Sequence, residues 1–125
     1  MLGSGFIGRF YTDSLHGYRN KDRVVSIYSR REESAKKFAE DYDVPHWTTD
    51  MEESISRPEV DVVCISLPNN LHEEAVHLCC KHNKAVICTK PLGRTAEEAK
   101  RMVEAVEKAG IFAGYLEDLC YTPKF

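Results

Sequence analysis

Three glycines stand at the start of the chain with a fixed spacing. Gly3, Gly5 and Gly8 belong to the run Gly-Ser-Gly-Phe-Ile-Gly at residues 3–8. Between a strand and a helix, this spacing allows a tight turn, a close approach of the backbone to a pyrophosphate and close helix–strand packing. Backbone N–H groups and the helix dipole then hold the phosphates. The pattern predicts a dinucleotide site made by Gly3, Ser4, Gly5, Phe6, Ile7 and Gly8; the alternative is a tight turn in an α/β domain that binds something else.

Basic side chains follow the expected strand at residues 24–28. An acidic residue normally stands at this point and binds the adenosine ribose of NAD, and this chain has none. Ser29 instead supplies a hydroxyl, and Arg30 and Arg31 supply guanidinium groups that can bind the extra phosphate of NADP. NADP is therefore the preferred cofactor, with NAD as the second choice. In the competing interpretation, these arginines are a solvated helix start whose field Glu32 and Glu33 partly offset.

Two further clusters follow later strands, at residues 66–72 and 88–92. The carboxyl ends of parallel strands line the ligand crevice of an open sheet, so both clusters are candidates for cofactor binding. The first contributes Ser66, Leu67, Pro68, Asn69 and His72, and the second contributes Thr89, Lys90 and Pro91.

Together with the glycine loop, these clusters resemble the N-terminal domain of the glucose-fructose oxidoreductase, inositol dehydrogenase and MocA family (Gfo/Idh/MocA). The resemblance covers nearly the whole chain. The family carries Pro-Asn-x-x-His after its fourth strand, matched by Pro68, Asn69 and His72, and Glu-Lys-Pro after its fifth, matched by Lys90 and Pro91. Thr89 replaces the glutamate, which leaves open whether ribose binding or lysine orientation changes.

The resemblance implies an NAD(P)-dependent oxidoreductase that acts on a CH–OH group of a sugar, polyol or related hydroxy compound. Lys90 would be the catalytic residue: it would reach the nicotinamide ribose and the reacting hydroxyl and help to move a proton while hydride passes to or from nicotinamide. Without the flanking pattern, Lys90 would be a surface lysine. We also expect the Lys90–Pro91 bond to be cis.

Two more residues have open roles. His72, in the first turn of its helix, either faces the crevice, as the family pattern suggests, or is an exposed imidazole. Glu117, just after the last strand, falls where the family contacts the nicotinamide end. The alternative for Glu117 and Asp118 is a solvated loop.

The elements that position these residues alternate along the chain. Apolar runs predict strands at 24–28, 44–47, 61–67, 85–88 and 111–115, separated by amphipathic helices. The residue pairs Asp50 and Glu53, Asn70 and Glu73, and Thr95 and Glu98 have the spacing of helix capping boxes. The fold class is therefore α/β, a Rossmann-like doubly wound parallel sheet in one NAD(P)-binding domain, residues 1–125.

Both ends look truncated in comparison with that family. Only Met1 and Leu2 precede the glycine loop, so the central first strand is nearly absent, and we expect backbone edges to be left unpaired. Residues 119–125 resemble the bridge into a second, substrate-binding domain. The expectation is that the chain is a fragment, inactive by itself, which melts poorly or associates and binds cofactor weakly. The runner-up is a non-catalytic dinucleotide-binding module or sensor; a coenzyme A or adenosylmethionine binder is disfavoured by Lys90 and Pro91.

Bulk composition excludes several other classes. The 125 residues carry a net charge of −3 with interspersed signs, and neither the basic runs of a nucleic-acid binder nor the long apolar stretch of a membrane protein occurs. The five cysteines, at 64, 79, 80, 88 and 120, lack C-x-x-C spacing, which predicts reduced thiols, no metal site and a cytoplasmic protein. A metal site of His72, His77, Cys79, Cys80 and His82 is disfavoured because these residues do not share one helical face. The expected partners are a small-molecule substrate and, at full length, further copies of the protein.

Overall fold

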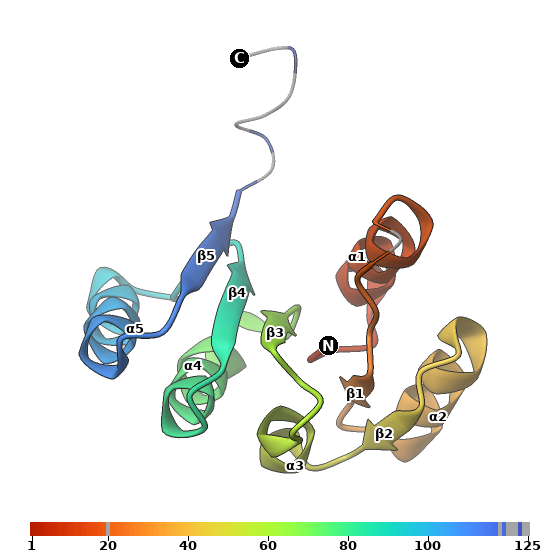
Figure 1. Cartoon of the computed structure of the whole chain (residues 1–125). Coiled ribbons are helices and arrows are strands. Elements are labelled where there is room, and N and C mark those ends of the chain that lie inside the picture. Colours follow the sequence, from red (N-terminus) through yellow and green to blue (C-terminus); the bar gives the residue numbers. More distant parts are fainter. Residues whose placement is uncertain (20, 118, 120–122, 124–125) are drawn as a thin grey trace.

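Helices and strands alternate along the whole chain (Figure 1). The computed structural model describes residues 1–19, 21–117, 119 and 123. The elements are α1 (Phe6–Gly17), β1 (Ser26–Tyr28), α2 (Glu32–Tyr42), β2 (His46–Thr48), α3 (Met51–Ser56), β3 (Val62–Ile65), the 3-10 turn η1 (Asn69–Leu71), α4 (His72–Lys81), β4 (Ala85–Thr89), α5 (Ala96–Ala109) and β5 (Ala113–Leu116). This order confirms the α/β class.

All strand pairs are parallel. β1 pairs with β2, and β4 lies between β3 and β5. Leu2 forms parallel bridges to Tyr28 of β1 and to Ile65 of β3. The resulting order is β2, β1, Leu2, β3, β4, β5, in which the chain winds outward from the centre in both directions. The predicted doubly wound parallel sheet is confirmed.

The first strand is short but paired on both sides. Leu2 N donates to Cys64 O at 2.8 Å, and Leu2 O accepts from Ser66 N at 2.8 Å. On the other side, Tyr28 N donates to Met1 O at 3.0 Å and Gly3 N donates to Tyr28 O at 2.9 Å. The expectation of unpaired edges is therefore wrong at residues 1–3, because two residues are enough to join both halves of the sheet.

Side chains from alternate positions divide between two apolar clusters. Leu2 packs with residues of β3, β4, α3, α4 and α5, including Ile55, Ile65 and Met102, each at most 1% exposed. Met1 packs in a second cluster with Ile27 of β1 and Phe38 of α2. Neighbouring residues of a strand point to opposite faces, so each face of the sheet buries its own core.

At two of the three predicted capping boxes, only the N-cap half forms: Asp50 N donates to Thr48 Oγ1 and Glu98 accepts from Arg94 N in place of the return bond. Asp50 accepts from Glu53 N and Thr95 accepts from Glu98 N, at the starts of α3 and α5. The box at Asn70 is wrong: a 3-10 turn occupies residues 69–71, and α4 begins at His72 with no side-chain cap. The turn follows Pro68, whose fixed φ of −56° already directs the chain.

Candidate functional site

The glycine loop forms an open backbone cradle at the start of α1. Gly3 has φ +106°, and a Cβ there would lie 2.5 Å from Ser66 O; a Cβ on Gly8 would lie 2.1 Å from Gly3 O. Gly5, by contrast, faces open space, since a Cβ there would meet nothing within 4 Å. The two tight glycines fix the turn, and the open one leaves the space in front of it free.

The N-terminus of α1 is free to bind an anion. Gly5 is the N-cap residue, no side chain caps the helix, and its first turn contains no acidic residue. The first N–H groups of a helix have no partner within it and carry the positive end of the helix dipole. These donors face the space that Gly5 leaves open, which fits the pyrophosphate of a dinucleotide.

The end of β1 meets this cradle. Ser4 Oγ donates to Ser29 Oγ at 2.8 Å, which fixes the glycine loop beside the strand end. A cavity of about 420 Å³ is lined by the loop together with Ser29, Arg30 and Arg31. Both arginine side chains are exposed, and neither forms a hydrogen bond or ion pair with another described residue. They are therefore available to an anionic ligand.

The acidic neighbours of the arginines do not neutralise them by direct contact. Glu32 pairs with Lys36 at 2.6 Å, one turn along α2, rather than with an arginine. Tyr28, at the base of the same cavity, has its pKa raised by burial and, to a smaller extent, by Glu74. Its hydroxyl therefore stays protonated and can donate a hydrogen bond.

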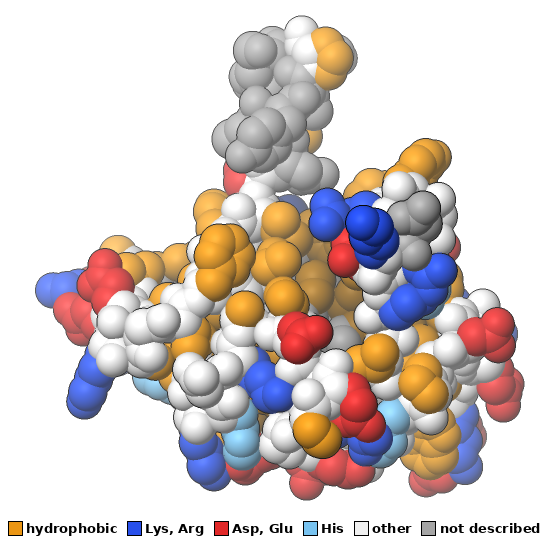
Figure 2. All heavy atoms as spheres, viewed as in Figure 1, with side chains coloured by type: hydrophobic (Ala, Val, Ile, Leu, Met, Phe, Trp, Pro, Cys, Tyr) orange, Lys and Arg blue, Asp and Glu red, His pale blue; other side chains and the backbone are white. Residues whose placement is uncertain are grey.

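A second cavity continues the first toward β4. It has a volume of about 360 Å³ and shares Phe6, Ile7, Ser66 and Leu67 with the first. Asn69, Thr89 and Lys90 provide its polar lining. Its other wall is apolar: in Figure 2, hydrophobic side chains fill the surface between the regions of β4 and α1. The two cavities thus form one cleft from the arginines to the lysine.

Lys90 stands at one end of this cleft. The bond between Lys90 and Pro91 is cis, as predicted. The Lys90 side chain is exposed and forms no hydrogen bond or ion pair with another described residue. Thr89, which stands where the family has glutamate, is buried at 7% exposure and lines the same cavity. Pro68 and Asn69 also line the cleft, whereas Pro91 lies outside it.

His72 is placed differently from both expectations. Its side chain is 0% exposed and lines neither cavity, so the prediction of a crevice-facing or solvent-exposed ring is wrong. Both ring nitrogens instead lie within 3.2 Å of backbone carbonyl oxygens. The ring lies between the segments that follow β3 and β4, where it contacts the carbonyls of Leu67, Pro91 and Leu92.

Glu117 follows β5 and lines neither cavity. Its side chain is half-buried, and its Oε1 atom is buried with no hydrogen-bond partner among the described residues. The pairing of Leu116 with Thr89 places Glu117 at the same edge of the sheet as Lys90. Asp118 and most of the expected bridge at 119–125 lie outside the described residues.

Several cleft residues were not anticipated from the sequence. Phe10 and Tyr11 line the cavity at Lys90, and Ser34 and Leu71 line the cavity at the arginines. Phe10 follows Phe6 by four positions, and the two rings stack with centroids 6.5 Å apart. Helical spacing was the available signal, since residues i and i+4 share a face.

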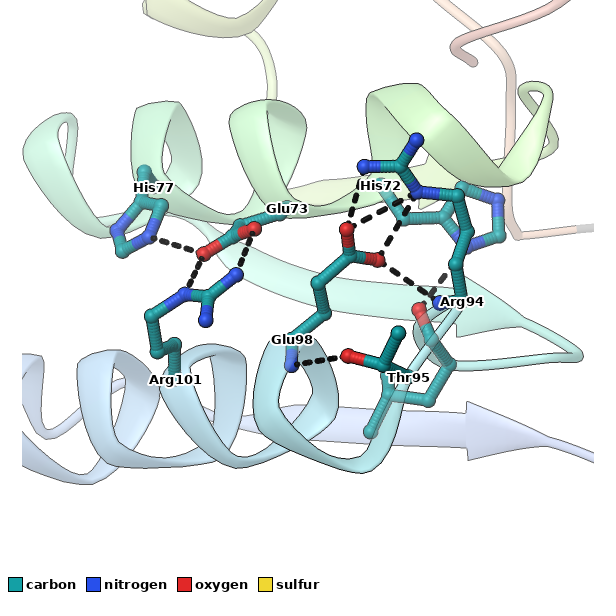
Figure 3. Close-up of polar contacts among 8 residues, drawn as sticks. His72, Glu73, His77, Arg94, Thr95, Glu98 and Arg101 are labelled. Atoms are coloured by element: carbon teal, nitrogen blue, oxygen red, sulfur yellow. Dashed lines mark hydrogen bonds and ion pairs between the residues drawn. The ribbon is translucent and has the colours of Figure 1, made fainter.

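The loop that carries Lys90 is fixed to α5 by a carboxylate. Glu98 accepts from the backbone N of Arg94 at 2.8 Å and from its guanidinium group, while Glu98 N donates to Thr95 Oγ1 (Figure 3). In the same view, Glu73 of α4 binds Arg101 of α5 through both carboxylate oxygens. These contacts hold the two helices and the loop together behind the cleft.

Within the described part of the chain, no group of His, Cys, Asp and Glu side chains could hold a metal ion. Cys64, Cys79, Cys80 and Cys88 are free thiols, and Cys120 lies outside the described residues. Burial raises the pKa of Cys79 and of Cys88 to about 12. Of the helices in the described residues, none combines the length and apolarity needed to cross a membrane.

Comparisons with known proteins agree with this geometry. The model of the Gfo/Idh/MocA family, described as an oxidoreductase family with an NAD-binding Rossmann fold, matches residues 1–115. Bovine (Bos taurus) trans-1,2-dihydrobenzene-1,2-diol dehydrogenase is 34% identical over 113 residues, which are 90% of this chain and 34% of that protein. The 1,5-anhydro-D-fructose reductase of Ensifer adhaerens is 36% identical over 91 residues, 73% of this chain and 27% of the reductase.

A solved structure shows the same fold. The NAD binding oxidoreductase from Klebsiella pneumoniae matches with a TM-score of 0.87 and 26% identity, over 98% of this chain and 34% of that one. The chain thus spans about a third of the length of the relatives that it matches.

Proposed function

This chain belongs to the Gfo/Idh/MocA family of oxidoreductases, and on that premise we propose that it is the nucleotide-binding part of an NAD(P)-dependent enzyme. The enzyme transfers hydride between nicotinamide and a carbon that bears a hydroxyl group, in a sugar, polyol or related compound. The dihydrodiol dehydrogenase and anhydrofructose reductase among its relatives support this substrate class.

The observation that carries the proposal is the continuous cleft. At one end, the arginines and the free N-terminus of α1 suit the phosphates of a dinucleotide. At the other end, Lys90, Thr89 and Asn69 surround the space for the nicotinamide riboside. Phe6 and Ile7 line both cavities and would cover the ligand between its two ends.

Bound nicotinamide would supply the hydride chemistry, and the residues of the chain would position it. The ammonium group of Lys90 has no partner among the described residues, so it can donate to a ribose hydroxyl and to the reacting substrate oxygen. In the reduction, the ammonium would give a proton to that oxygen as the C–H bond forms, and in the oxidation the neutral amine would take the hydroxyl proton as the C–H bond breaks. The apolar wall of Phe6 and Phe10 would limit the access of water.

We further propose NADP as the preferred cofactor. Ser29, Arg30 and Arg31 would bind the additional phosphate, since Ser29 already lies against Ser4 of the loop and the arginines are free. A cytoplasmic location and assembly of the full-length protein into homo-oligomers complete the proposal. The free thiols support such a location.

The test is the substitution Arg30→Ala. Loss of a charge-assisted bond costs roughly 1.5–3 kcal/mol, so we expect NADPH affinity to fall roughly 10- to 100-fold while NADH affinity changes little. Cofactor fluorescence titration measures both. Lys36→Ala is the matched control, because Lys36 is an exposed cation on α2 outside the cleft.

Equal losses for the two cofactors would contradict the NADP preference, and no binding of either would contradict the cofactor site itself. The main rival is a module or sensor that binds the dinucleotide without turnover. Because this chain is expected to be inactive by itself, an assay with a panel of sugars and polyols separates the two when it is run on a protein that also carries a substrate-binding domain. Binding with no turnover there supports the module.

A further inference from the structure

His72 is a buried side chain that touches both loops of the Lys90 end of the cleft. Its Nε2 atom lies 2.9 Å from the carbonyl oxygen of Leu67, which lines both cavities. Its Nδ1 atom lies 3.0 Å from Pro91 O and 3.2 Å from Leu92 O. One ring therefore bridges the loop after β3 and the loop after β4.

A neutral ring carries one N–H, so the position of its proton decides which loop it donates to, and it bonds both segments at once only when the proton is on Nε2. With its proton on Nδ1, the ring donates to Pro91 O or Leu92 O, and with its proton on Nε2, it donates to Leu67 O. In the second case, Nδ1 can accept from the thiol of Cys88, whose Sγ lies 3.5 Å away. Cys88 belongs to the end of β4, two residues before Lys90. The ring thus keeps a contact to this segment in either arrangement.

Lys90 depends on this backbone for its position. Its own side chain has no partner among the described residues, so only the chain on either side of it directs it into the cleft. The carbonyl of Pro91, the next residue, is the one nearest to Nδ1 of His72. Beyond it, Arg94 is held by Glu98 of α5, so the loop is fixed at two points (Figure 3).

We propose that His72 is a positioning residue that sets the distance between the Leu67 loop and the Lys90 loop. It acts through the backbone and does not touch cofactor or substrate. The role extends the proposed function, on which it rests for the importance of Lys90. Without ring nitrogens, the carbonyls of Leu67 and Pro91 lose their part-buried contacts with the ring, and the carbonyl that the ring N–H serves loses a hydrogen bond worth about 1 kcal/mol. The loops then move apart to reach water.

The experiment reads Lys90 directly in the cofactor-free protein. Lysines are reductively methylated with ¹³C-formaldehyde, and the Lys90 dimethylamino signal, assigned with Lys90→Arg, is compared by NMR among variants. We expect His72→Phe, which keeps a ring but no donor, to shift and broaden this signal. His72→Gln, which keeps one amide donor, should restore it in part. His77→Gln is the control, because His77 lies on the same helix, is exposed and pairs with Glu73.

Unchanged Lys90 signals in His72→Phe and His72→Gln, with both proteins folded, would overturn the proposal. If His72→Phe does not fold, the Gln variant alone decides. An intermediate shift of its Lys90 signal supports the proposal, and an unchanged Lys90 signal overturns it. In the turnover assay, kcat should fall about 100-fold in His72→Phe with little change in the KM for NADPH. Failure of the wild-type protein to bind NADPH would refute the proposed function, and the NMR comparison would still test His72.

Discussion

At the scale of single residues, Lys90 is the one on which the proposed chemistry depends. We expect Lys90→Met, which keeps the length of the side chain without its charge, to lower turnover about 100-fold or more, because proton transfer by a positioned group contributes at least that much. NADPH affinity should change far less, since the arginines and the helix N-terminus remain.

Steady-state turnover and cofactor titration on the same preparations check this expectation. Lys81→Met is a suitable control, because Lys81 is a surface lysine that pairs with Glu52 far from the cleft. Equal turnover in the Lys90 variant and the wild-type protein would remove Lys90 from the mechanism.

The buried thiols make stability depend on pH in the alkaline range. Burial raises the pKa of Cys79 and Cys88 in the folded state from the ordinary value of 9.0 to about 12. Above pH 9 the unfolded chain therefore loses thiol protons that the folded chain retains. The free energy of unfolding should be unaffected by these groups below pH 9 and fall by about 1.4 kcal/mol per pH unit for each thiol between pH 9 and 12.

Urea unfolding at pH 8, 9 and 10 measures this decline. The variant with Cys79→Ala and Cys88→Ala is less stable because of its cavities, but its decline between pH 9 and 10 should be smaller. Parallel declines in the two proteins would show that the thiols are not its source.

The sequence pattern identified most residues that line the cleft, but it did not predict where the His72 side chain lies. The glycines, the arginines and Lys90 carry their chemistry in their type and spacing, so they could be found without a structure. The ring of His72 is placed by contacts with Leu67, Pro91 and Leu92, which lie on two separate loops, and the 3-10 turn before it was not predicted. A histidine that binds backbone carbonyls leaves no pattern in the sequence.

At the scale of elements, the glycines where the glycine loop meets α1 differ in the space around them: Gly8 has no room for a Cβ, and Gly5 has open space. Gly8→Ala would place a Cβ 2.1 Å from Gly3 O, and we expect it to lower the free energy of unfolding by more than about 2 kcal/mol. Gly5→Ala meets no atom within 4 Å and should cost less than about 1 kcal/mol. Its methyl group would still occupy the space in front of the helix N-terminus, so NADPH affinity should fall about tenfold or more.

Thermal melts and cofactor titrations of the two variants distinguish these effects. Gly17→Ala, which also has open space but lies at the far end of α1, controls for the change of residue type. Full NADPH affinity in Gly5→Ala would place the pyrophosphate elsewhere.

The helices and strands were largely predictable, because hydrophobic periodicity and capping act locally. On α2, the apolar residues Ala35, Phe38 and Ala39 share one face at helical spacing, and all three are buried. On α5, Met102 is buried but its apolar neighbour Val103 is 46% exposed, so only part of the apolar surface of this helix faces the core. On α1, the apolar residues at Phe6 and Phe10 line the cleft instead of the core. Periodicity finds an apolar face, and tertiary packing decides what covers it.

At the scale of the whole molecule, Leu2 connects two sub-sheets that do not otherwise pair. Its side chain is 1% exposed within the larger core cluster. We expect Leu2→Ala to lower the free energy of unfolding by about 2–5 kcal/mol, the range for truncation of a buried leucine. Val103→Ala, at a half-exposed site on α5, should cost far less.

Chemical denaturation followed by circular dichroism measures both variants. A loss below 1 kcal/mol in Leu2→Ala would mean that the two halves of the sheet are held together elsewhere.

Leu2, which joins the two sub-sheets, lies next to the glycine loop. Ligand binding at the loop is therefore linked to the stability of the sheet. Gly3 N donates to Tyr28 O on the β1 side of Leu2, and Ser66 N donates to Leu2 O on the β3 side. A dinucleotide that binds only the folded chain, in which Leu2 pairs with both sub-sheets, would raise the free energy of unfolding by about 2.7 kcal/mol at a concentration one hundred times its Kd. The cofactor would then stabilise the sheet at Leu2, where the first strand is shortest.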